Sequence, residues 1–517
     1  MKKKHSVVSI VIFSIILYWM LLPLLLVIIS FRIDILLGLS WNFNPLRITI
    51  GSVLIILSVY LALWAANAVY FFGKGLPLST FPPKYLIRSG PYSFVRNPLY
   101  IAFFFYLLCL GLILSPSMTY IVNPLFALFL IPYTIREEKI LTEKFGSKYT
   151  DYRSVVPAIF PFKKRIKNAP YMVSPLIILL YLIVSTVLRK LFGLKLKGKL
   201  KRDVGPYIIL SNHRSYLDPL FIVGAICMPV RFITTGKMFE SFLLEKFFLS
   251  LSCIPLKRSS GVRSIIRTKE ALGNGDIVGI FPEASRTWDG NLISFDRRVV
   301  KFIKSLGYPI VFLRIDGGYN VLPRWSKVFH RANVTVKVTG EIEDPGELSE
   351  AELQSIMEEC LSNSKRSEAR WGSFNKYIER LLWTCPECGN LHTIKRVGRR
   401  GFYCIHCKSR WFIDPLMKIV PILYEKMKKN ILKNGINLPL KIKDGLTLYK
   451  NNLQIREKYI PLKDITFLAI DGVNYIQIGT KGKTSIGIKT YDALKLKTCI
   501  EILRGVRENL DRDPFWF

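Results

Sequence analysis

The chain has 517 residues, of which 50% are hydrophobic and 21% are charged. Its 74 lysines and arginines stand against 37 acidic residues, a formal net charge of +37 at pH 7, and its mean hydropathy is positive. These values exclude a wholly soluble protein and indicate an anionic partner. Long apolar segments favour membrane lipids with anionic headgroups over nucleic acid.

Four apolar segments near the amino terminus are predicted to cross a membrane, at residues 7–31, 46–72, 99–114 and 117–134. The loop at 73–98 and the stretch at 136–169 are basic, whereas residues 32–46 and 115–117 contain few lysines or arginines. The positive-inside rule therefore predicts an integral membrane domain, residues 1–162, with four spans and both ends in the cytoplasm.

Residues 171–188 form a further apolar segment, and a basic cluster follows it at residues 189–202. A fifth crossing would place this cluster and the rest of the chain on the opposite side. We therefore expect residues 163–194 to form an interfacial or re-entrant linker, with the later catalytic domain on the cytoplasmic face.

Six short motifs lie in order around the third and fourth apolar segments. They are Gly73-Lys74-Gly75-Leu76-Pro77, Pro82-Pro83, Gly90-Pro91-Tyr92, Arg96-Asn97-Pro98-Leu99-Tyr100, Glu137-Glu138, and Phe145-Gly146 with Tyr149 and Tyr152. This order resembles the isoprenylcysteine carboxyl methyltransferase and phospholipid methyltransferase group over residues 45–162.

The resemblance implies that S-adenosylmethionine binds at the cytoplasmic side, near Arg96, Asn97, Tyr100, Glu137 and Glu138. Charged residues beside an apolar hairpin mark either a site or an interfacial anchor, and both interpretations stay open. Asn97 stands where many relatives have His, and its amide cannot titrate, which argues against acid–base chemistry at that position.

Short apolar runs alternate with helical stretches over residues 195–375, which predicts an α/β domain. Residues 207–210 and 277–281 are expected strands, and they end beside His213 and Glu283. Asp218 precedes a proline and is expected to be the N-cap of a helix. Because open α/β sheets bind ligands at the carboxyl ends of their strands, a common site is predicted there.

The residue types suggest roles at this site. His213 is the candidate general base for a hydroxyl, and Asp218 would orient its ring. Arg286 offers a bidentate donor for phosphate, and Glu283 could position Arg286 or the hydroxyl.

The run from His213 to Asp218, followed by Phe281-Pro282-Glu283-Ala284-Ser285-Arg286, resembles the HX4D and FPEGTR motifs of glycerolipid acyltransferases of the lysophosphatidate type. The resemblance implies transfer of an acyl group from acyl-CoA or acyl carrier protein to a lysophospholipid such as 1-acylglycerol-3-phosphate. It also places Lys257 and Arg258 at the acceptor-phosphate site. Ala284-Ser285 replaces the usual Gly-Thr.

Two Cys-x2-Cys pairs, Cys385 with Cys388 and Cys404 with Cys407, are separated by fifteen residues. This spacing predicts a structural zinc ribbon over residues 380–415. The other cysteines form no paired framework, which indicates a reducing compartment.

Polar and apolar residues alternate over 440–505, and residues 491–508 form an amphipathic stretch. We expect residues 416–517 to be a small β-rich domain, similar to a pleckstrin-homology module, which would contact lipid headgroups or another protein. The chain is thus predicted to be a multidomain membrane acyltransferase with a methyltransferase-like domain. The alternatives are a lipid or isoprenylcysteine methyltransferase as the main activity, and a lipid-binding scaffold with silent sites.

Overall fold

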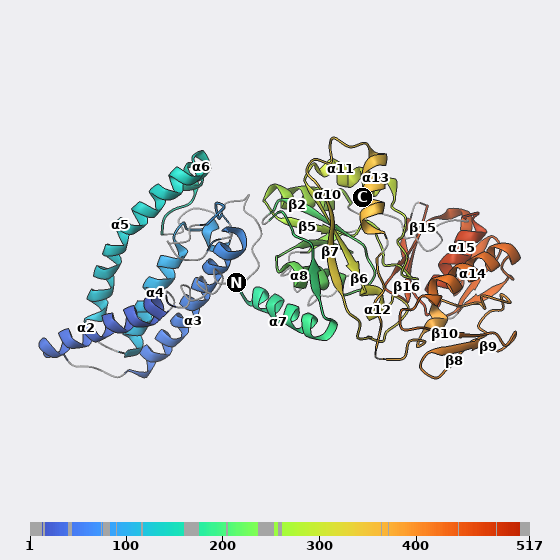
Figure 1. Cartoon of the computed structure of the whole chain (residues 1–517), viewed down its shortest axis with the longest axis horizontal. Coiled ribbons are helices and arrows are strands. Elements are labelled where there is room, and N and C mark those ends of the chain that lie inside the picture. Colours follow the sequence, from blue (N-terminus) through green and yellow to red (C-terminus); the bar gives the residue numbers. More distant parts are fainter. Residues whose placement is uncertain are drawn as a thin grey trace. The chain divides into compact units, whose positions relative to one another are not determined.

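The computed structural model describes residues 13, 16–39, 44–73, 75, 83–88, 90–114, 117–159, 175–202, 205–235, 253–256, 261–362, 364–370, 372–442, 444–481 and 483–506. The chain forms two compact units. The first contains Met1–Leu179 with Gly273–Gly275, and the second contains Leu180–Leu272 with Asp276–Phe517. Long helices make up the first unit, whereas the second combines sheets and helices (Figure 1).

The first unit is helical, as expected. Its helices are α2 (Leu22–Leu36), α3 (Pro45–Ala68), α4 (Pro98–Leu114), α5 (Thr119–Phe145) and α6 (Ser147–Val155), with π-helical turns at Leu17–Leu21 and Val69–Gly73. The Asn44 side chain caps α3 by accepting hydrogen bonds from the amides of Leu46 and Arg47.

Among the described residues of this unit, two helices are long and apolar enough to cross a membrane by length and composition, Leu17–Leu36 and Pro45–Ala68. The helix α4 is apolar but has 17 residues. The helix α5 continues to Phe145, beyond the span expected at 117–134, and so carries Glu137 and Glu138 within a helix. Two long apolar helices suggest membrane association.

The second unit contains a seven-stranded sheet in the order β1-β7-β6-β2-β5-β3-β4. Its strands are β1 (Lys195–Lys197), β2 (Tyr207–Ser211), β3 (Arg231–Thr235), β4 (Ile254–Leu256), β5 (Ile277–Ile280), β6 (Ile310–Asp316) and β7 (Thr335–Ile342). All neighbours pair in parallel except β6 and β7. The predicted α/β domain is therefore present.

Both faces of this sheet are buried. In β2, Tyr207 and Ile209 belong to one hydrophobic cluster, and Ile208 and Leu210 belong to another. This explains why the strand is a continuous apolar run, since side chains on both faces are covered. The helices of this region are α7 (Pro175–Phe192), α8 (Asp218–Ile226), α10 (Gly261–Gly273), α11 (Arg297–Leu306), α12 (Gly318–Val321) and α13 (Glu350–Leu361).

Three small antiparallel sheets follow. Their strands are β8 (Ile394–Val397), β9 (Gly401–Cys404) and β10 (Arg410–Phe412), then β11 (Leu440–Ile442), β12 (Leu446–Leu448), β13 (Asn452–Ile455) and β14 (Lys458–Pro461), and finally β15 (Ile465–Asp471), β16 (Tyr475–Thr480) and β17 (Lys483–Lys489). The expected final helix is α15 (Ala493–Leu503). The helix α14 (Ile419–Asn434) was not expected.

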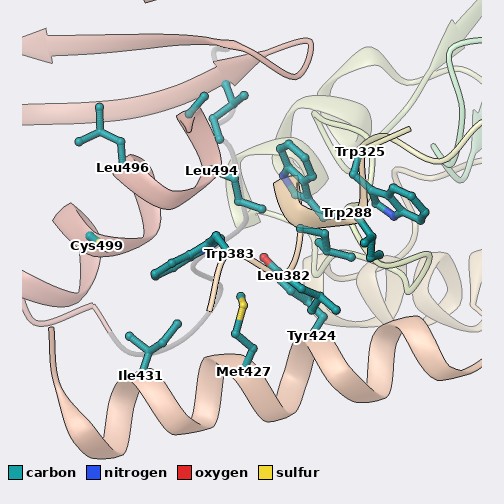
Figure 2. Packing of buried hydrophobic residues seen from close by; sticks show 14 of the residues in the cluster. Trp288, Trp325, Leu382, Trp383, Tyr424, Met427, Ile431, Leu494, Leu496 and Cys499 are labelled. Carbon is teal, nitrogen blue, oxygen red and sulfur yellow. The ribbon is translucent and has the colours of Figure 1, made fainter. Parts of the chain in front are cut away.

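One hydrophobic core joins these elements to the region of the large sheet. It contains Trp288 and Trp325 from the sheet region, Trp383 beside the first cysteine pair, Met427 from α14 and Leu494 from α15. Figure 2 shows Met427 pointing from α14 toward Trp383. This packing is therefore shared between the segments predicted as domains 195–375, 380–415 and 416–517.

Candidate active site

His213 lies two residues after the end of β2, and its ring is held on two sides. Its Nδ1 is 2.9 Å from Oδ2 of Asp218, and its ring stacks on Phe281 with centroids 4.2 Å apart. The imidazole is 19% exposed, whereas the Asp218 carboxylate is fully buried. The structure therefore brings together the two residues predicted as a base and its orienting acid.

The position of Asp218 corrects one expectation. Leu217 is the N-cap of α8, and Asp218 is the first helical residue. Its Oδ2 accepts hydrogen bonds from the amides of Arg214 at 2.5 Å and Ser215 at 2.7 Å. The carboxylate thus organises the turn from His213 instead of capping the helix, and this turn brings the two side chains together.

Glu283 follows β5, and both of its carboxylate oxygens have partners in the protein. Oε1 accepts a hydrogen bond from the amide of His213 at 2.7 Å, and Oε2 accepts one from the amide of Ile293 at 3.0 Å. The guanidinium of Arg214 lies 3.5 Å from Oε2. Glu283 therefore joins the ends of β2 and β5, which are paired strands.

Arg286 is buried, with 6% exposure, and its guanidinium carbon lies 3.1 Å from the ring centroid of Tyr216. Among the described residues, its Nη1 has no hydrogen-bond partner. A buried guanidinium nitrogen without a partner costs free energy, so the site favours an anionic ligand there. Lys257 and Arg258, predicted for the same site, lie outside the described residues.

Arg324, which was not predicted as a site residue, contacts the same loop. Its Nη1 donates to the carbonyl of Arg286 at 2.7 Å, and its Nη2 donates to the carbonyl of Ile470 in β15 at 2.8 Å. Its Nε donates to the carbonyl of Gly472 at 3.1 Å. The Arg324 guanidinium also lies 4.4 Å from the ring of Trp288. Arg324 thus connects the loop that carries Arg286 to the β15–β16 turn.

Burial controls the protonation of this site. It lowers the pKa of His213, an effect that the Asp218 carboxylate opposes and the charges of Arg286 and Arg324 strengthen. Burial also raises the pKa of Glu283 to about 7, against the attraction of Arg214. It lowers the pKa of Arg286 to about 10. A neutral His213 beside a cation suits a base that works on an anionic substrate.

The first unit holds a second polar cluster, where α4 begins and α5 passes. Arg96 donates through Nε to Oε1 of Glu138 at 2.9 Å and through Nη1 to the carbonyl of Val156 at 2.8 Å. The Tyr100 hydroxyl donates to Oε2 of Glu137 at 2.8 Å. The main-chain amide of Asn97 donates to the carbonyl of Ala158 at 3.1 Å.

This second cluster contains all five residues predicted for the cofactor, but they mostly engage one another or the main chain. The Arg96 and Glu138 side chains are 11% and 16% exposed. Burial raises the pKa of Glu137, although the hydrogen bond from Tyr100 opposes the change. The set of one guanidinium and two carboxylates fits the carboxylate, ammonium and hydroxyl groups of S-adenosylmethionine in charge and hydrogen-bonding type.

The four cysteines lie together, as predicted. Sγ of Cys385 is 3.6 Å from Sγ of Cys407, and Sγ of Cys388 is 3.8 Å from Sγ of Cys404. All four sulfur atoms lie within 4.8 Å of one another. Tetrahedral zinc with Zn–S bonds of about 2.3 Å requires sulfur separations of roughly 3.8 Å, so the arrangement fits.

Two family models match the chain. Residues 194–316 match an acyltransferase family, and residues 46–148 match a phospholipid methyltransferase family. The first match contains His213, Asp218, Glu283 and Arg286, and the second contains the five residues around Arg96 and Glu137. Both resemblances seen in the motifs are confirmed for these segments.

Similar proteins agree with the first match. The chain is 28% identical over 135 residues to a chloroplastic 1-acyl-sn-glycerol-3-phosphate acyltransferase of Arabidopsis thaliana, covering 25% of this chain and 38% of the relative. It is 28% identical over 93 residues to the enzyme of that name from Bacillus subtilis, covering 18% of this chain and 46% of the relative. The matches thus span less than half of each relative.

A solved structure is also similar, that of the 1-acyl-sn-glycerophosphate acyltransferase from Thermotoga maritima. The similarity covers 51% of this chain and 92% of the solved chain, with 18% sequence identity and a TM-score of 0.31.

Proposed function

We propose that the chain is an integral membrane enzyme that transfers a fatty acyl group from a thioester to a hydroxyl of a glycerophosphate lipid. The acceptor would be a lysophospholipid such as 1-acylglycerol-3-phosphate, and the donor would be acyl-CoA or acyl carrier protein. The observation that carries the proposal is the His213–Asp218 pair close to the buried Arg286, whose Nη1 has no partner among the described residues.

His213 would act as the general base. Its Nδ1 is engaged by Asp218, so Nε2 is the nitrogen that takes the proton from the acceptor hydroxyl. The acceptor oxygen then attacks the thioester carbonyl, the ester bond forms and the carbon–sulfur bond breaks. The proton on His213 passes to the leaving thiolate. Asp218 stays ionised and stabilises the imidazolium while it exists.

Arg286 would bind the acceptor phosphate, with Lys257 and Arg258 as further contacts. The Tyr216 ring, which is 42% exposed, covers the Arg286 guanidinium. A phosphate would therefore reach Nη1 past the edge of this ring or after the ring moves. Glu283 was expected to meet substrate, but its contacts favour a positioning role, since it fixes the main chain of His213.

Purified full-length protein, assayed with acyl-CoA and 1-acylglycerol-3-phosphate, tests this function. His213→Ala should abolish ester formation, because the base is lost and no core side chain is removed. His406→Ala, at an exposed histidine far along the chain, should retain activity. Near-normal acyl transfer by the His213 variant would refute the assignment, and inactivity of wild-type protein with every thioester would favour a scaffold role.

The match of residues 46–148 to the phospholipid methyltransferase family favours a second activity, methyl transfer from S-adenosylmethionine. Arg96, Glu137 and Glu138 would hold the cofactor, with Asn97 and Tyr100 beside them, and the cofactor would supply the methyl group. Calorimetric titration of purified protein with S-adenosylmethionine tests this, with Glu137→Gln expected to weaken binding. Glu143→Gln, an exposed residue on the same helix, is the control.

We further propose that Cys385, Cys388, Cys404 and Cys407 hold one structural zinc ion. Four thiolates leave no open position on a tetrahedral ion, so no catalytic role follows. Both catalytic regions would lie on the cytoplasmic face, where acyl thioesters are made.

A further inference from the structure

A small basic cavity lies in the second unit, away from His213. Arg370, Gly372, Phe374, Arg399 and Arg400 line it, and its volume is about 220 Å³. Binding pockets for whole drug-sized molecules usually hold roughly 300–1,000 Å³, so the size of this cavity suits a polar headgroup better than a whole lipid.

The three arginines of the cavity have their charges available. Among the described residues, no carboxylate forms an ion pair with Arg370, Arg399 or Arg400. The guanidinium of Arg400 lies 5.0 Å from the ring of Phe374, which is itself buried. Converging guanidinium groups without carboxylate partners are a site for phosphate.

The main chain around the cavity is tightly fixed. The buried Asn375 side chain donates to the carbonyls of Val397 at 3.3 Å, Gly398 at 3.1 Å and Gly401 at 2.6 Å. The amide of Phe374 donates to the carbonyl of Arg399 at 2.8 Å. The turn between β8 and β9 is therefore anchored, which fixes the main chain that carries Arg399 and Arg400.

Exposed apolar side chains flank the same turn. Val397 and Phe412 both pair with Gly401 across the three-stranded sheet, and they are 57% and 65% exposed. Apolar side chains beside a cluster of cations match the interfacial region of a bilayer with anionic lipid. A site for free phosphate would not account for the exposure of these two side chains, whereas a site for a lipid headgroup at the bilayer surface would.

A chain of contacts connects the cavity to α7. The amide of Arg370 donates to the carbonyl of Arg331, and Nε of Arg331 donates to the carbonyl of Leu191. Beside this contact, α7 exposes Ile183, Val187 and Leu191. The cavity is thus connected to a second apolar surface.

We propose that this cavity binds the phosphate of an anionic phospholipid headgroup at the membrane surface, with Val397 and Phe412 entering the interfacial layer. The proposal is independent of acyl or methyl transfer, because none of its residues belongs to either site. It assigns the four-cysteine region a role in holding the protein against anionic membrane.

Full-length protein in neutral detergent tests the proposal, with binding of dioctanoyl phosphatidylglycerol measured by native mass spectrometry. The triple variant Arg370→Gln, Arg399→Gln, Arg400→Gln should bind about ten-fold more weakly, as expected for lost charge-assisted contacts. The control Lys395→Gln, Lys408→Gln, Arg410→Gln removes three charges nearby and should match wild type. Dioctanoyl phosphatidylcholine should bind weakly to all three proteins.

An equal loss of lipid binding in the two triple variants would mean that the overall positive charge of the region attracts the lipid, and would overturn the proposal. Inorganic phosphate that displaces the lipid at an equal concentration would indicate a site for free phosphate and would also overturn it. The single variants Arg399→Gln and Phe412→Ser keep the test decisive if the triple variant does not fold. Each should weaken lipid binding, and Phe412→Ser should leave binding of inorganic phosphate unchanged.

Discussion

Nε of Arg324 donates a hydrogen bond to the main-chain carbonyl of Gly472, 3.1 Å away, and Nη1 of the same guanidinium donates to the carbonyl of Arg286. The β15–β16 turn is therefore tied to the loop that carries the proposed phosphate ligand. A Cβ on Gly472 would lie 3.1 Å from the hydroxyl of Tyr216, the residue whose ring covers Arg286. The β15–β16 turn thus takes part in shaping the proposed acyl acceptor site.

Gly472→Ala should raise the KM for the lysophospholipid acceptor several-fold while changing kcat less. The added Cβ displaces Tyr216, and the φ of +72° adds strain of about 1 kcal/mol at the turn. Steady-state kinetics on purified protein measure the effect. Gly445→Ala has a similar φ of +74° but no atom within 4 Å of its Cβ, so it is the matched control.

A double-mutant cycle separates this contact from general strain. Tyr216→Phe removes the hydroxyl that the new Cβ would meet, so the acceptor KM of the double variant should lie close to that of Tyr216→Phe alone. Additive effects of the two substitutions would mean that the turn does not act through Tyr216.

Asp218→Asn should lower kcat/KM by about 10²-fold or more and move the acidic limb of the pH profile to lower pH. Burial lowers the pKa of His213 and the Asp218 carboxylate raises it, so removing that charge lowers the pKa further. Protonated His213 cannot accept a proton, and activity is therefore lost as the pH falls through this pKa. The control Asp296→Asn changes the cap of α11 and should keep the wild-type profile.

An acidic limb that stays in place or moves to higher pH in Asp218→Asn would contradict the pairing of this carboxylate with the catalytic base.

Ala284→Gly should stabilise the protein by up to about 1 kcal/mol. An L-residue in the left-handed region has a backbone strain of about 1–2 kcal/mol, which glycine removes. Part of this gain is offset because glycine has a larger conformational entropy in the unfolded chain. Ala284 has a φ of 59°. It stands at the position of the glycine in the FPEGTR motif that the Phe281–Arg286 segment resembles. Thermal unfolding of full-length protein measures the change. Ala351→Gly, on an exposed position of α13, should lower Tm instead.

The structure reproduces those parts of the fold that depend on local pattern. Strand β2 and the delivery of His213 at its end follow from a short apolar run, and the cysteine cluster follows from spacing. The helix α14 could have been predicted too, since its buried Val420, Leu423, Met427 and Ile431 follow helical spacing.

The remaining parts depend on contacts between distant segments, which one sequence does not contain. The sequence predicted that Glu283 binds substrate, because its true partners cannot be seen in a motif. These partners are the main-chain amides of His213 and Ile293, which only folding brings near the carboxylate. Arg324 belongs to no recognised motif, and its role depends on β15, almost 150 residues further on. Its only local signal is its place between Pro323 and Trp325.

Purified protein should contain about one zinc ion per chain, as expected for four thiolates at tetrahedral separations. Cys404→Ser should lose the metal and lower the thermal stability of the second unit, because Cys404 also belongs to its main hydrophobic core. Cys360→Ser, at a partly buried thiol outside the cluster, should retain the zinc. Metal analysis that finds no zinc in protein never exposed to chelator would refute the site.

The face of the membrane on which His213 lies depends on α7. The carboxyl half of this helix packs on the second unit, where the Ser185 hydroxyl donates to the carbonyl of Gly224 at 2.8 Å and Leu188 joins the core. The ten residues of α7 before Ser185, starting at Pro175, extend roughly 15 Å as a helix, whereas the hydrocarbon core is about 30 Å thick. We therefore predict that α7 does not cross the membrane while these contacts hold, and its exposed side chains suit an interfacial position.

Impermeant maleimide labelling in sealed vesicles tests this, with single cysteines introduced as Lys148→Cys and Lys199→Cys at exposed positions on either side of α7. Both should be labelled from the cytoplasmic side, because the four predicted spans return the chain to the face where it starts and α7 does not cross. The exposed native Cys227 is replaced by Ser so that it gives no background. Labelling of the two positions from opposite faces would establish a fifth span and place His213 and Arg286 away from the cytoplasm, where acyl thioesters could not reach them.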